Sequence, residues 1–392
     1  MNCKLAWVLL ITLSLAAFAH GQTSAGIWPV VNCDAGQSLN SAISKLNKHV
    51  PNTVMVQGTC TEYVQITGFD NLTVKGFPVA TIVQPSTIPT KLFLTLLRID
   101  ASRSVLIEGL NFSSDASKPP AIGIGAGSRD VRLRKLSIVG GSAGIFVFEN
   151  SQVSIAGITV QNAGWASLGI ADASDVHAED CLFEDLTGTS WHSGVSAGAS
   201  HLTMRRTIIR NMQVGINLAA SSIVDLGDFN TYYPAGGVSD VVIESPNGMN
   251  NNGVVIDSGS SLNVTTAKLR IVNAGQNWSG SSGGILVSGG SQLYASANLI
   301  ISGSRGQGIY LTNNSHATLD GSSITGSQHG GVVAVNLSTV STVFWDLPVT
   351  VSGNAVDLFC DSQSVISGAA KIVNATSVQC TNLLSGDSVP IP

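Results

Sequence analysis

The stretch GIFVFENSQVSIAGITV (144–160) contains a pattern that recurs along most of the chain. A Gly is followed by Ile or Val, then by a Ser-x-apolar-x-apolar step and a second apolar pair, and the pattern returns as GILVSGGSQLYASANLII (284–301). The Ser of this step falls at Ser128, Ser151, Ser174, Ser200, Ser221, Ser260, Ser291, Ser315 and Ser338. Successive serines are 23, 23, 26, 21, 39, 31, 24 and 23 residues apart. We therefore predict one repeated structural unit, with insertions in the two longest intervals.

Apolar residues alternate over short runs inside each unit, as in Val153 and Ile155 or in Leu202 and Met204. Alternation with a period of two is typical of β-strands. Several short strands in one unit form a coil that buries its apolar face only when coils stack, with strands about 4.8 Å apart. The pattern predicts an all-β solenoid of roughly a dozen coils.

In coil length and pattern, the chain resembles the right-handed parallel β-helix proteins of the pectate-lyase-like superfamily, of the secreted bacterial type. The resemblance covers about residues 55–380 and includes no catalytic signature of a specific enzyme family. It implies a right-handed parallel β-helix. The pattern of the polygalacturonase-like enzymes is not met, because the chain has no Asp-Asp pair and no Arg-x-Lys.

The two ends of the chain differ from the repeat. Residues 1–21 have a cation at Lys4, an apolar run and the sequence Ala17-Phe18-Ala19, which predict a signal peptide. We predict an N-terminal segment with a capping helix over 22–53, the β-helix over 54–380 and a C-terminal tail over 381–392.

The capping helix is predicted within GQSLNSAISKLNKHV (36–50). Ser38 is a suitable N-cap, and Leu39, Ile43, Leu46 and Val50 share one helical face. A separate small domain is the alternative, although so short a segment is too small for its own core.

Five cysteines follow the predicted signal peptide. In an oxidising compartment they can form two disulfides, and we expect Cys33–Cys60 near one end and Cys360–Cys380 near the other. Cys181 lies among apolar residues and is predicted to be a buried, inert thiol.

The composition excludes several classes of protein. Charged residues make up 11% of the chain, and the net charge is −5. A disordered chain would have more charge and fewer apolar residues, and a nucleic-acid-binding protein would be basic. We expect no nucleic-acid partner, no transmembrane segment in the mature chain, and a monomer.

The densest charged cluster comprises His177, Glu179, Asp180, Arg205 and Arg206. Alignment on the serine step places Glu179 level with Arg205 and Asp180 level with Arg206. One interpretation is a pair of stacked surface ion pairs, each contributing at most about 1 kcal/mol. The other follows from the resemblance, which implies acidic calcium ligands on one coil and an Arg or Lys base on a neighbour, as in a polysaccharide lyase.

Aromatic residues occur before corresponding glycines and in the insertion DFNTYYPAGG (228–237). Flat apolar rings beside polar groups suit sugars, so a second set of candidates is predicted to bind substrate: Trp165, Trp191, His192, Tyr232, Tyr233 and Trp278. Alternatively, these rings fold back over the edges of the coils.

We expect a protein that is secreted, on the cell surface or periplasmic and that binds extracellular or cell-wall polysaccharide or a cell-surface glycan. One alternative is a polysaccharide lyase or related carbohydrate-active enzyme, and another is a structural or adhesive surface protein. No cofactor is expected unless the protein is a lyase, for which calcium is possible.

Overall fold

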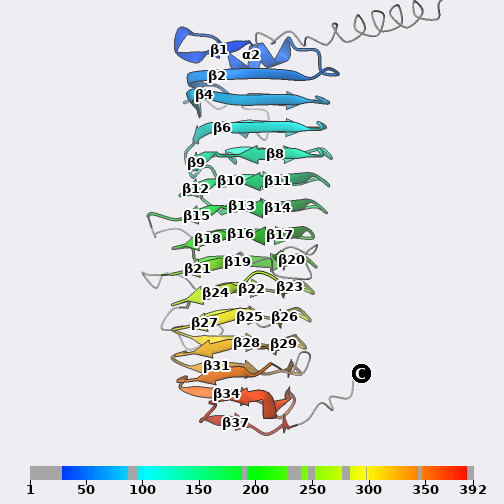
Figure 1. Ribbon diagram of the computed structural model, residues 1–392, viewed down its shortest axis with the longest axis vertical. Helices are drawn as coiled ribbons and strands as arrows, with labels where there is room; N and C mark the ends of the chain where they lie inside the picture. The colour runs from blue at the N-terminus through cyan, green and yellow to red at the C-terminus, as the bar shows by residue number, and fades with distance from the viewer. Residues whose placement is uncertain are drawn as a thin grey trace, which may run out of the picture.

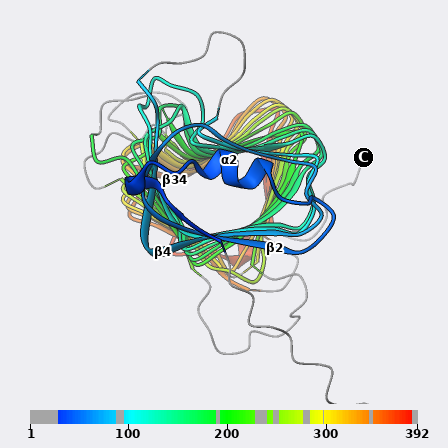
Figure 2. The same ribbon diagram turned by 90° about the horizontal axis from the view of Figure 1, so that it is seen from above.

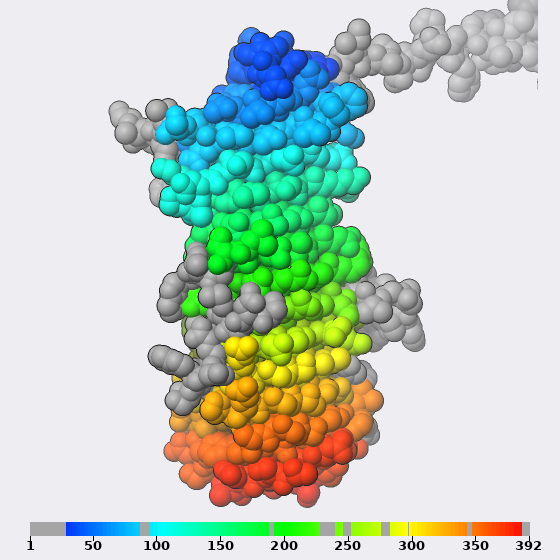
Figure 3. Space-filling model, turned by 90° about the vertical axis from the view of Figure 1, so that its left-hand side faces the viewer, coloured from blue at the N-terminus to red at the C-terminus, as the bar shows by residue number. Residues whose placement is uncertain are grey.

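A computed structural model describes residues 29–86, 95–187, 192–227, 240–245, 252–275, 283–296, 298–342 and 347–385. The predicted signal peptide and the candidate binding residues Trp191, Tyr232, Tyr233 and Trp278 lie outside these ranges. Coils of parallel strands stack along one long axis, from β1 and β2 at one end to β37 at the other (Figure 1). Space-filling atoms show the coils following one another without a break in the column (Figure 3).

One wall of the column is a parallel sheet, here called sheet B, which has 13 strands in the described residues. Each coil contributes one strand to it: β3 (Val64–Thr67), β5 (Leu97–Asp100), β7 (Ile122–Gly125), β10 (Ala143–Val147), β13 (Ala166–Ile170), β16 (Ser193–Gly198), β19 (Val214–Ala219), β22 (Asn252–Ile256), β25 (Gly283–Val287), β28 (Gln307–Leu311), β31 (Gly330–Ala334), β34 (Val356–Cys360) and β37 (Val378–Cys380).

The remaining strands form sheet A, which has 25 strands in the described residues. It begins with β1 (Val30–Asn32), β2 (Asn52–Thr61), β4 (Leu72–Val83) and β6 (Val105–Ser113). It then divides at a corner into two strips. The first strip contains β8 (Val131–Arg134), β11 (Gln152–Ala156), β14 (Asp175–Glu179), β17 (His201–Arg205), β20 (Ile223–Leu226), β23 (Ser261–Val264), β26 (Gln292–Ser296), β29 (His316–Asp320), β32 (Thr339–Ser341), β35 (Val365–Ser367) and β38 (Leu383–Leu384). The second strip contains β9 (Ser137–Val139), β12 (Thr159–Gln161), β15 (Leu182–Glu184), β18 (Thr207–Arg210), β21 (Val241–Glu244), β24 (Leu269–Val272), β27 (Leu299–Ser302), β30 (Ser323–Thr325), β33 (Val349–Ser352) and β36 (Ile372–Val373).

Alternate residues of each strand point into the column, as the period of two predicts. Val153 of β11 pairs in register with Val176 of β14, which pairs with Leu202 of β17, and all three are buried. Each fully buried aliphatic side chain contributes about 1.5–3 kcal/mol. Stacking like residues on like residues thus fills the core and sets the register of the outward-facing residues.

A ladder of buried serines marks the turn from sheet B to sheet A. The hydroxyl of Ser128 donates to the carbonyl of Gly125 at 2.7 Å, and the amide of Ser102 donates to the Ser128 oxygen at 3.3 Å. In the coil of β20 the ladder contains Ser222, because its amide donates to Ser260 Oγ at 3.1 Å. The predicted repeat residue Ser221 is therefore wrong by one position. Ser221 instead lies in the left-handed region, with φ of 62°.

A second ladder explains the glycine that opens each repeat. A Cβ on Gly308 would lie 2.3 Å from Ile324 Cγ2 of the second strip, so a side chain there would collide with the core. The same contact with a core Ile or Val recurs at Gly144, Gly194, Gly215, Gly253, Gly284 and Gly331. In the coil of β13 this place belongs to Ser167, whereas the repeat alignment put Gly169 there. Gly169 pairs with Phe146 and has another role.

The N-terminal end of the column carries a short helix, α2 (Leu39–Ser44), which lies across the opening when the column is viewed from above (Figure 2). The predicted segment was longer. Leu39 and Ile43 are buried, but Val50 is exposed because the helix ends at Ser44. Ser38 is the N-cap, and its oxygen accepts from the amide of Ser41 at 3.0 Å.

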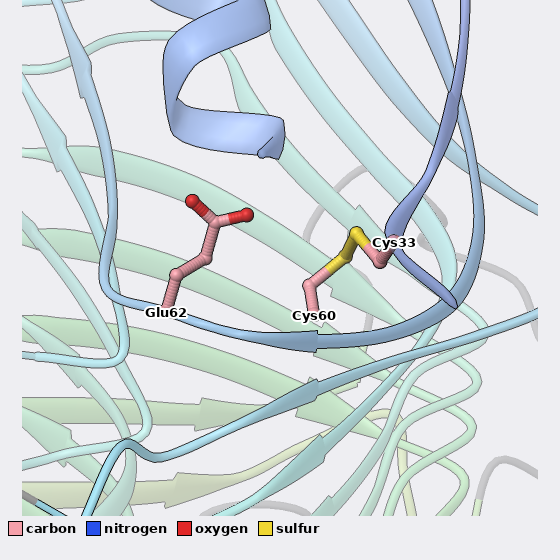
Figure 4. A group of neighbouring side chains, drawn as sticks. All are labelled: Cys33, Cys60 and Glu62. Atoms are coloured by element: carbon pink, nitrogen blue, oxygen red, sulfur yellow. A yellow bond between two sulfur atoms is a disulfide. The ribbon is translucent and has the colours of Figure 1, made fainter. Parts of the chain in front are cut away.

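Glu62 links the N-terminus of α2 to the first coil by hydrogen bonds. Its carboxylate accepts hydrogen bonds from the Ser38 hydroxyl at 2.6 Å and from the Leu39 amide at 2.6 Å. The predicted Cys33–Cys60 disulfide is present beside it and joins the short 3₁₀ helix η1 (Cys33–Ala35) to β2 (Figure 4). These two cysteines and Glu62 lie close enough together to be considered as metal ligands. The two sulfur atoms are bonded to each other, however, and the Glu62 carboxylate accepts hydrogen bonds from α2 and its N-cap.

The C-terminal coils are joined in the same way. The predicted Cys360–Cys380 disulfide links β34 to β37, and η2 (Ala369–Lys371) precedes β36. Cys181 is unpaired and buried, as predicted, and burial raises the pKa of its thiol to about 12. The helices in the described ranges are all too short or too polar to cross a bilayer.

Candidate functional site

The outer face of sheet B contains a cleft near the N-terminal third of the column. Its volume is about 460 Å³, and it is lined by Thr95, Arg98, Pro119, Pro120, Ser142, Phe146, Phe148, Glu149 and Trp165. We call it the sheet B cleft. The cleft is formed by or lies beside strands β5, β7, β10 and β13. The register of these strands pairs Arg98 with Gly123, Gly123 with Phe146, and Phe146 with Gly169.

Three aromatic rings form the apolar part of the cleft. The rings of Phe146 and Phe148 stack with centroids 5.0 Å apart and an interplanar angle of 20°. Trp165 meets Phe146 edge-on, at 5.9 Å and 80°. Trp165 retains 46% of its surface exposed, so part of the indole remains open to solvent beside the stacked pair.

Glycines in the floor of the cleft provide the space for these rings. A Cβ on Gly169 would lie 2.7 Å from Trp165 Cζ3 and 2.8 Å from Phe146 Cδ2. A Cβ on Gly125 would lie 2.7 Å from Phe148 Cε2. Trp165 and the two Phe rings therefore lie directly over backbone, and a larger floor residue would displace them.

The charged side chains of the cleft are held by neighbours. Arg98 Nε donates to both carboxylate oxygens of Asp100, at 2.7 and 2.8 Å, and the Arg98 guanidinium lies 4.4 Å from the centroid of Phe148. A Glu149 oxygen accepts from the amide of Ala126 at 2.8 Å.

The predicted catalytic cluster lies on sheet A and forms ion pairs. Arg205 donates to Glu179 at 2.6 Å, and Arg206 donates to both oxygens of Asp180 at 2.7 and 3.2 Å. Arg206 also pairs with Glu179. Asp180 and Arg206 lie at the corner between the strips with positive φ, whereas the neighbouring coil has Gly157 there. His177 occupies the adjacent outward ladder, level with Thr203. This arrangement matches the ion-pair interpretation.

A second polar cluster on the same face was not predicted as a site. The two ring nitrogens of His201 bond Asp175 at 2.9 Å and Asp225 at 2.8 Å, and Asn263 donates to Asp225 at 2.7 Å. The hydrogen bond to Asp175 is the largest cause that raises the pKa of His201, to about 10, and the same bond lowers the pKa of Asp175. The serine step places Asp175 level with His201, but Asp225 belongs to the next ladder, so the alignment did not bring it to His201.

His192, predicted to bind substrate, is buried. Its side chain is 2% exposed and forms an ion pair at 2.8 Å with Asp185, whose side chain is 1% exposed. Burial acts to raise the pKa of Asp185, but hydrogen bonds from Thr187 and His192 together lower it. His192, which directly precedes β16, therefore offers no surface to a ligand in this structure.

Among the described candidates, Trp165 and the predicted catalytic cluster do not meet. The sheet B cleft lies on β5, β10 and β13, whereas Glu179, Arg205 and the His201 cluster lie on β14, β17 and β20 of sheet A. Each coil passes from one wall to the other through a turn such as Glu149–Asn150. Trp165, the described aromatic member of the predicted binding set, thus lies on a different face from the predicted catalytic cluster.

Comparisons with known proteins support the fold. The family model described as "Right handed beta helix region" matches residues 94–229. No curated protein matches the chain in sequence. A variant of the catalytic domain of GH87 alpha-1,3-glucanase, in complex with tetrasaccharides, superposes with a TM-score of 0.62 at 11% identity, over 94% of this chain and 70% of that one.

Two other solved structures are similar. The catalytic unit of the GH87 alpha-1,3-glucanase from Streptomyces thermodiastaticus has a TM-score of 0.57 at 11% identity, covering 90% of this chain and 65% of that chain. Tailspike protein 3 of bacteriophage CBA120 has a TM-score of 0.52 at 11% identity, covering 100% and 70%. With its parallel coils, its serine and glycine ladders and these similarities, the chain is a right-handed parallel β-helix protein.

Proposed function

We propose that the protein is exported and binds a polysaccharide in the sheet B cleft. The observation that carries the proposal is the half-exposed indole of Trp165 beside the Phe146–Phe148 stack, inside a cleft of about 460 Å³. Sugar rings have apolar C–H faces that stack on aromatic rings, and their hydroxyl groups hydrogen-bond to polar residues at the edges. A concave, mostly aromatic site with few polar groups suits such a ligand.

Two further findings support this proposal. The glucanase structures are solved with nigerose and with tetrasaccharides, so sugars bind proteins built on this scaffold, although 11% identity is evidence of fold alone. The two disulfides fit an oxidising compartment outside the cytosol. The predicted signal peptide over 1–21 would deliver the chain there.

Binding is favoured over catalysis at the predicted lyase residues. A lyase base would have to be available to take a proton from the substrate. Arg205 and Arg206 instead donate to Glu179 and Asp180 on the neighbouring coil. The same carboxylates would have to release these arginines before they could hold calcium.

The test is the variant Trp165→Ala on an array of plant, fungal and bacterial polysaccharides. Loss of a buried aromatic anchor commonly costs 2 kcal/mol or more, so we expect affinity to fall by about 30-fold. Tyr310→Ala is the matched control, because Tyr310 lies in the same outward ladder as Phe146 and Gly169 but on the distant strand β28. It should leave the affinity unchanged.

Four outcomes would contradict the proposal. A wild-type protein that binds no glycan would overturn it, as would binding that Trp165→Ala leaves intact. Calcium-dependent release of unsaturated products from uronate polymers would favour a lyase instead. Cell attachment without any binding of soluble glycan would favour an adhesive surface protein.

A further inference from the structure

We infer that the sheet B cleft selects uncharged sugars and rejects uronates, with Asp100 as the residue that sets this specificity. The inference rests on the proposed function. It concerns the charge of the ligand, which the aromatic rings do not decide, because the rings of neutral and acidic sugars present similar C–H faces.

Arg98 is the cation that would otherwise attract an acidic sugar. Of the side chains that line the cleft in the described residues, only Arg98 and Glu149 are ionisable. Arg98 and Asp100 stand two residues apart on β5, so they project from the same face of the strand. Their side chains are 22% and 18% exposed, and Arg98 Nε donates to both oxygens of Asp100.

The position of Phe148 restrains this pair further. The guanidinium carbon of Arg98 lies 4.4 Å from the centroid of the Phe148 ring. Arg98 is therefore held between a carboxylate and an aromatic face. It cannot turn toward a ligand without giving up the charge-assisted bonds to Asp100, which are stronger than neutral hydrogen bonds.

Glu149 adds a negative charge that the lining does not balance. One of its oxygens accepts from the Ala126 amide, and the carboxylate lies over Gly125, the register partner of Asp100. The sum of charges from Arg98, Asp100 and Glu149 is −1. Lys118, which directly precedes the lining residue Pro119, interacts electrostatically with Asp115.

A uronate would therefore enter at a disadvantage. Its carboxylate would lose water without gaining an uncompensated cation from the described lining residues, and a buried charge without a partner is strongly unfavourable. It would also lie near Glu149. A neutral hexose polymer has the same apolar faces and meets none of these penalties. We assign the cleft to neutral polysaccharide.

The experiment uses oligosaccharides that differ only in charge. Galacturonate and glucuronate oligomers are arrayed both as free acids and as methyl esters, beside neutral glucans. The wild-type protein should bind neutral members, and should prefer any methyl ester to its free acid by at least about tenfold, equivalent to about 1.4 kcal/mol. This ratio is measured on the unmodified chain and does not depend on whether a variant folds.

Two variants then test whether Asp100 causes this preference for uncharged sugars. Asp100→Asn leaves Arg98 without its counter-charge and should raise affinity for free acids by about tenfold, an effect that about 0.5 M salt should largely remove. The double variant Asp100→Asn/Arg98→Gln should lose this gain. Thermal unfolding of each variant checks that the column is intact.

The outcomes separate this inference from the proposed function. If free acids bind as tightly as methyl esters and Trp165→Ala abolishes both, the specificity is refuted while sugar binding in the cleft stands. A folded Asp100→Asn protein with no gain for free acids also refutes it. If the wild-type protein binds no array member, both proposals fail together.

Discussion

The outer faces of the two sheets carry the same coils but very different side chains. On sheet A, the outward groups of β14 and β17 satisfy one another, as Glu179 and Arg205 do at 2.6 Å. On sheet B, Phe146 of β10 and Trp165, which directly precedes β13, lie against Gly169, and Trp165 remains 46% exposed. Stacking fixes the register equally on both walls. What differs is the kind of contact between neighbouring coils, which is an ion pair between Glu179 and Arg205 on sheet A and a ring contact between Phe146 and the half-exposed Trp165 on sheet B.

The largest effect should come from breaking the stack that supports both faces. Gly308→Ala would place a Cβ 2.3 Å from Ile324 Cγ2 and 2.6 Å from the carbonyl oxygen of Gly331. Overpacking of this kind typically costs 1–3 kcal/mol, and contact with the backbone puts this site near the upper value, so we expect a loss of about 3 kcal/mol in the free energy of unfolding.

Urea unfolding measures that loss, and Gly198→Ala is the matched control. A Cβ on Gly198 of β16 would meet nothing within 4 Å, so stability should change by less than about 0.5 kcal/mol. Equal effects of the two variants would show that the glycine ladder is not required by packing.

Disturbing the floor of the sheet B cleft should affect binding more than stability. In Gly169→Ala, the new Cβ meets the ends of the Trp165 and Phe146 rings, which can move outward. We expect glycan affinity to fall by about tenfold because the rings leave the geometry that fits the sugar. Calorimetric titration with the glycan checks this in Gly169→Ala, with Gly198→Ala as the control. Unchanged affinity in Gly169→Ala would mean that the position of the rings does not affect glycan binding.

On sheet A, the His201 cluster should make a pH-dependent contribution to the stability of the fold. The pKa of His201 is raised from 6.5 to about 10, chiefly by its bond to Asp175. A raised histidine pKa stabilises the fold fully below pH 6.5, and the stabilisation is lost as pH rises through about 10. The pKa of Asp175 is lowered, so its contribution is present above 3.8 and is lost as pH falls.

The variant His201→Gln tests the direction of this change in stability with pH. The gap in Tm between wild type and variant should be widest between about pH 4 and 6.5 and should close toward pH 10. His316 lies in the same outward ladder, but burial lowers its pKa. The gap for His316→Gln should therefore change with the opposite slope, growing in favour of wild type as pH rises toward 6.5. Parallel profiles for the two variants would contradict the assignment.

The smallest effect should come from the predicted catalytic pair. Glu179→Gln and Arg205→Gln remove an ion pair whose side chains are 22% and 24% exposed. Each should cost less than about 1 kcal/mol in unfolding experiments and leave glycan affinity unchanged. Loss of an enzymatic activity in either variant would support the catalytic interpretation. The functional site would then lie on sheet A and not in the sheet B cleft.

Much of the column could be predicted from the sequence because its period is local. Serines and core aliphatics recur at nearly constant spacing, and parallel stacking converts that spacing directly into contacts, including Glu179 over Arg205. Errors arose where small residues are abundant. Ser221 was chosen over Ser222, and Gly169 over Ser167, because neighbouring Ser and Gly residues fit the pattern almost equally well.

The sites were harder to predict because they depend on residues outside the period. The sheet B cleft joins Trp165 to Arg98 and Pro119, which lie in two other coils and carry no shared motif. In sequence, His192 is a neighbour of Trp191 and fits a ligand-binding set, yet its side chain is buried against Asp185. Asp225 reaches His201 diagonally between ladders, a contact that in-register alignment does not contain.

The sequence by itself determined the coil and most of the register, since both follow from a repeated pattern, and the position of the cysteines at the two ends predicted both disulfides. Only the tertiary structure decided which wall is open to a ligand. That depends on how side chains from successive coils pair across the surface. On sheet A, the opposite charges of Glu179 and Arg205 meet and satisfy one another, and on sheet B glycines leave room for aromatic rings, of which Trp165 remains about half exposed.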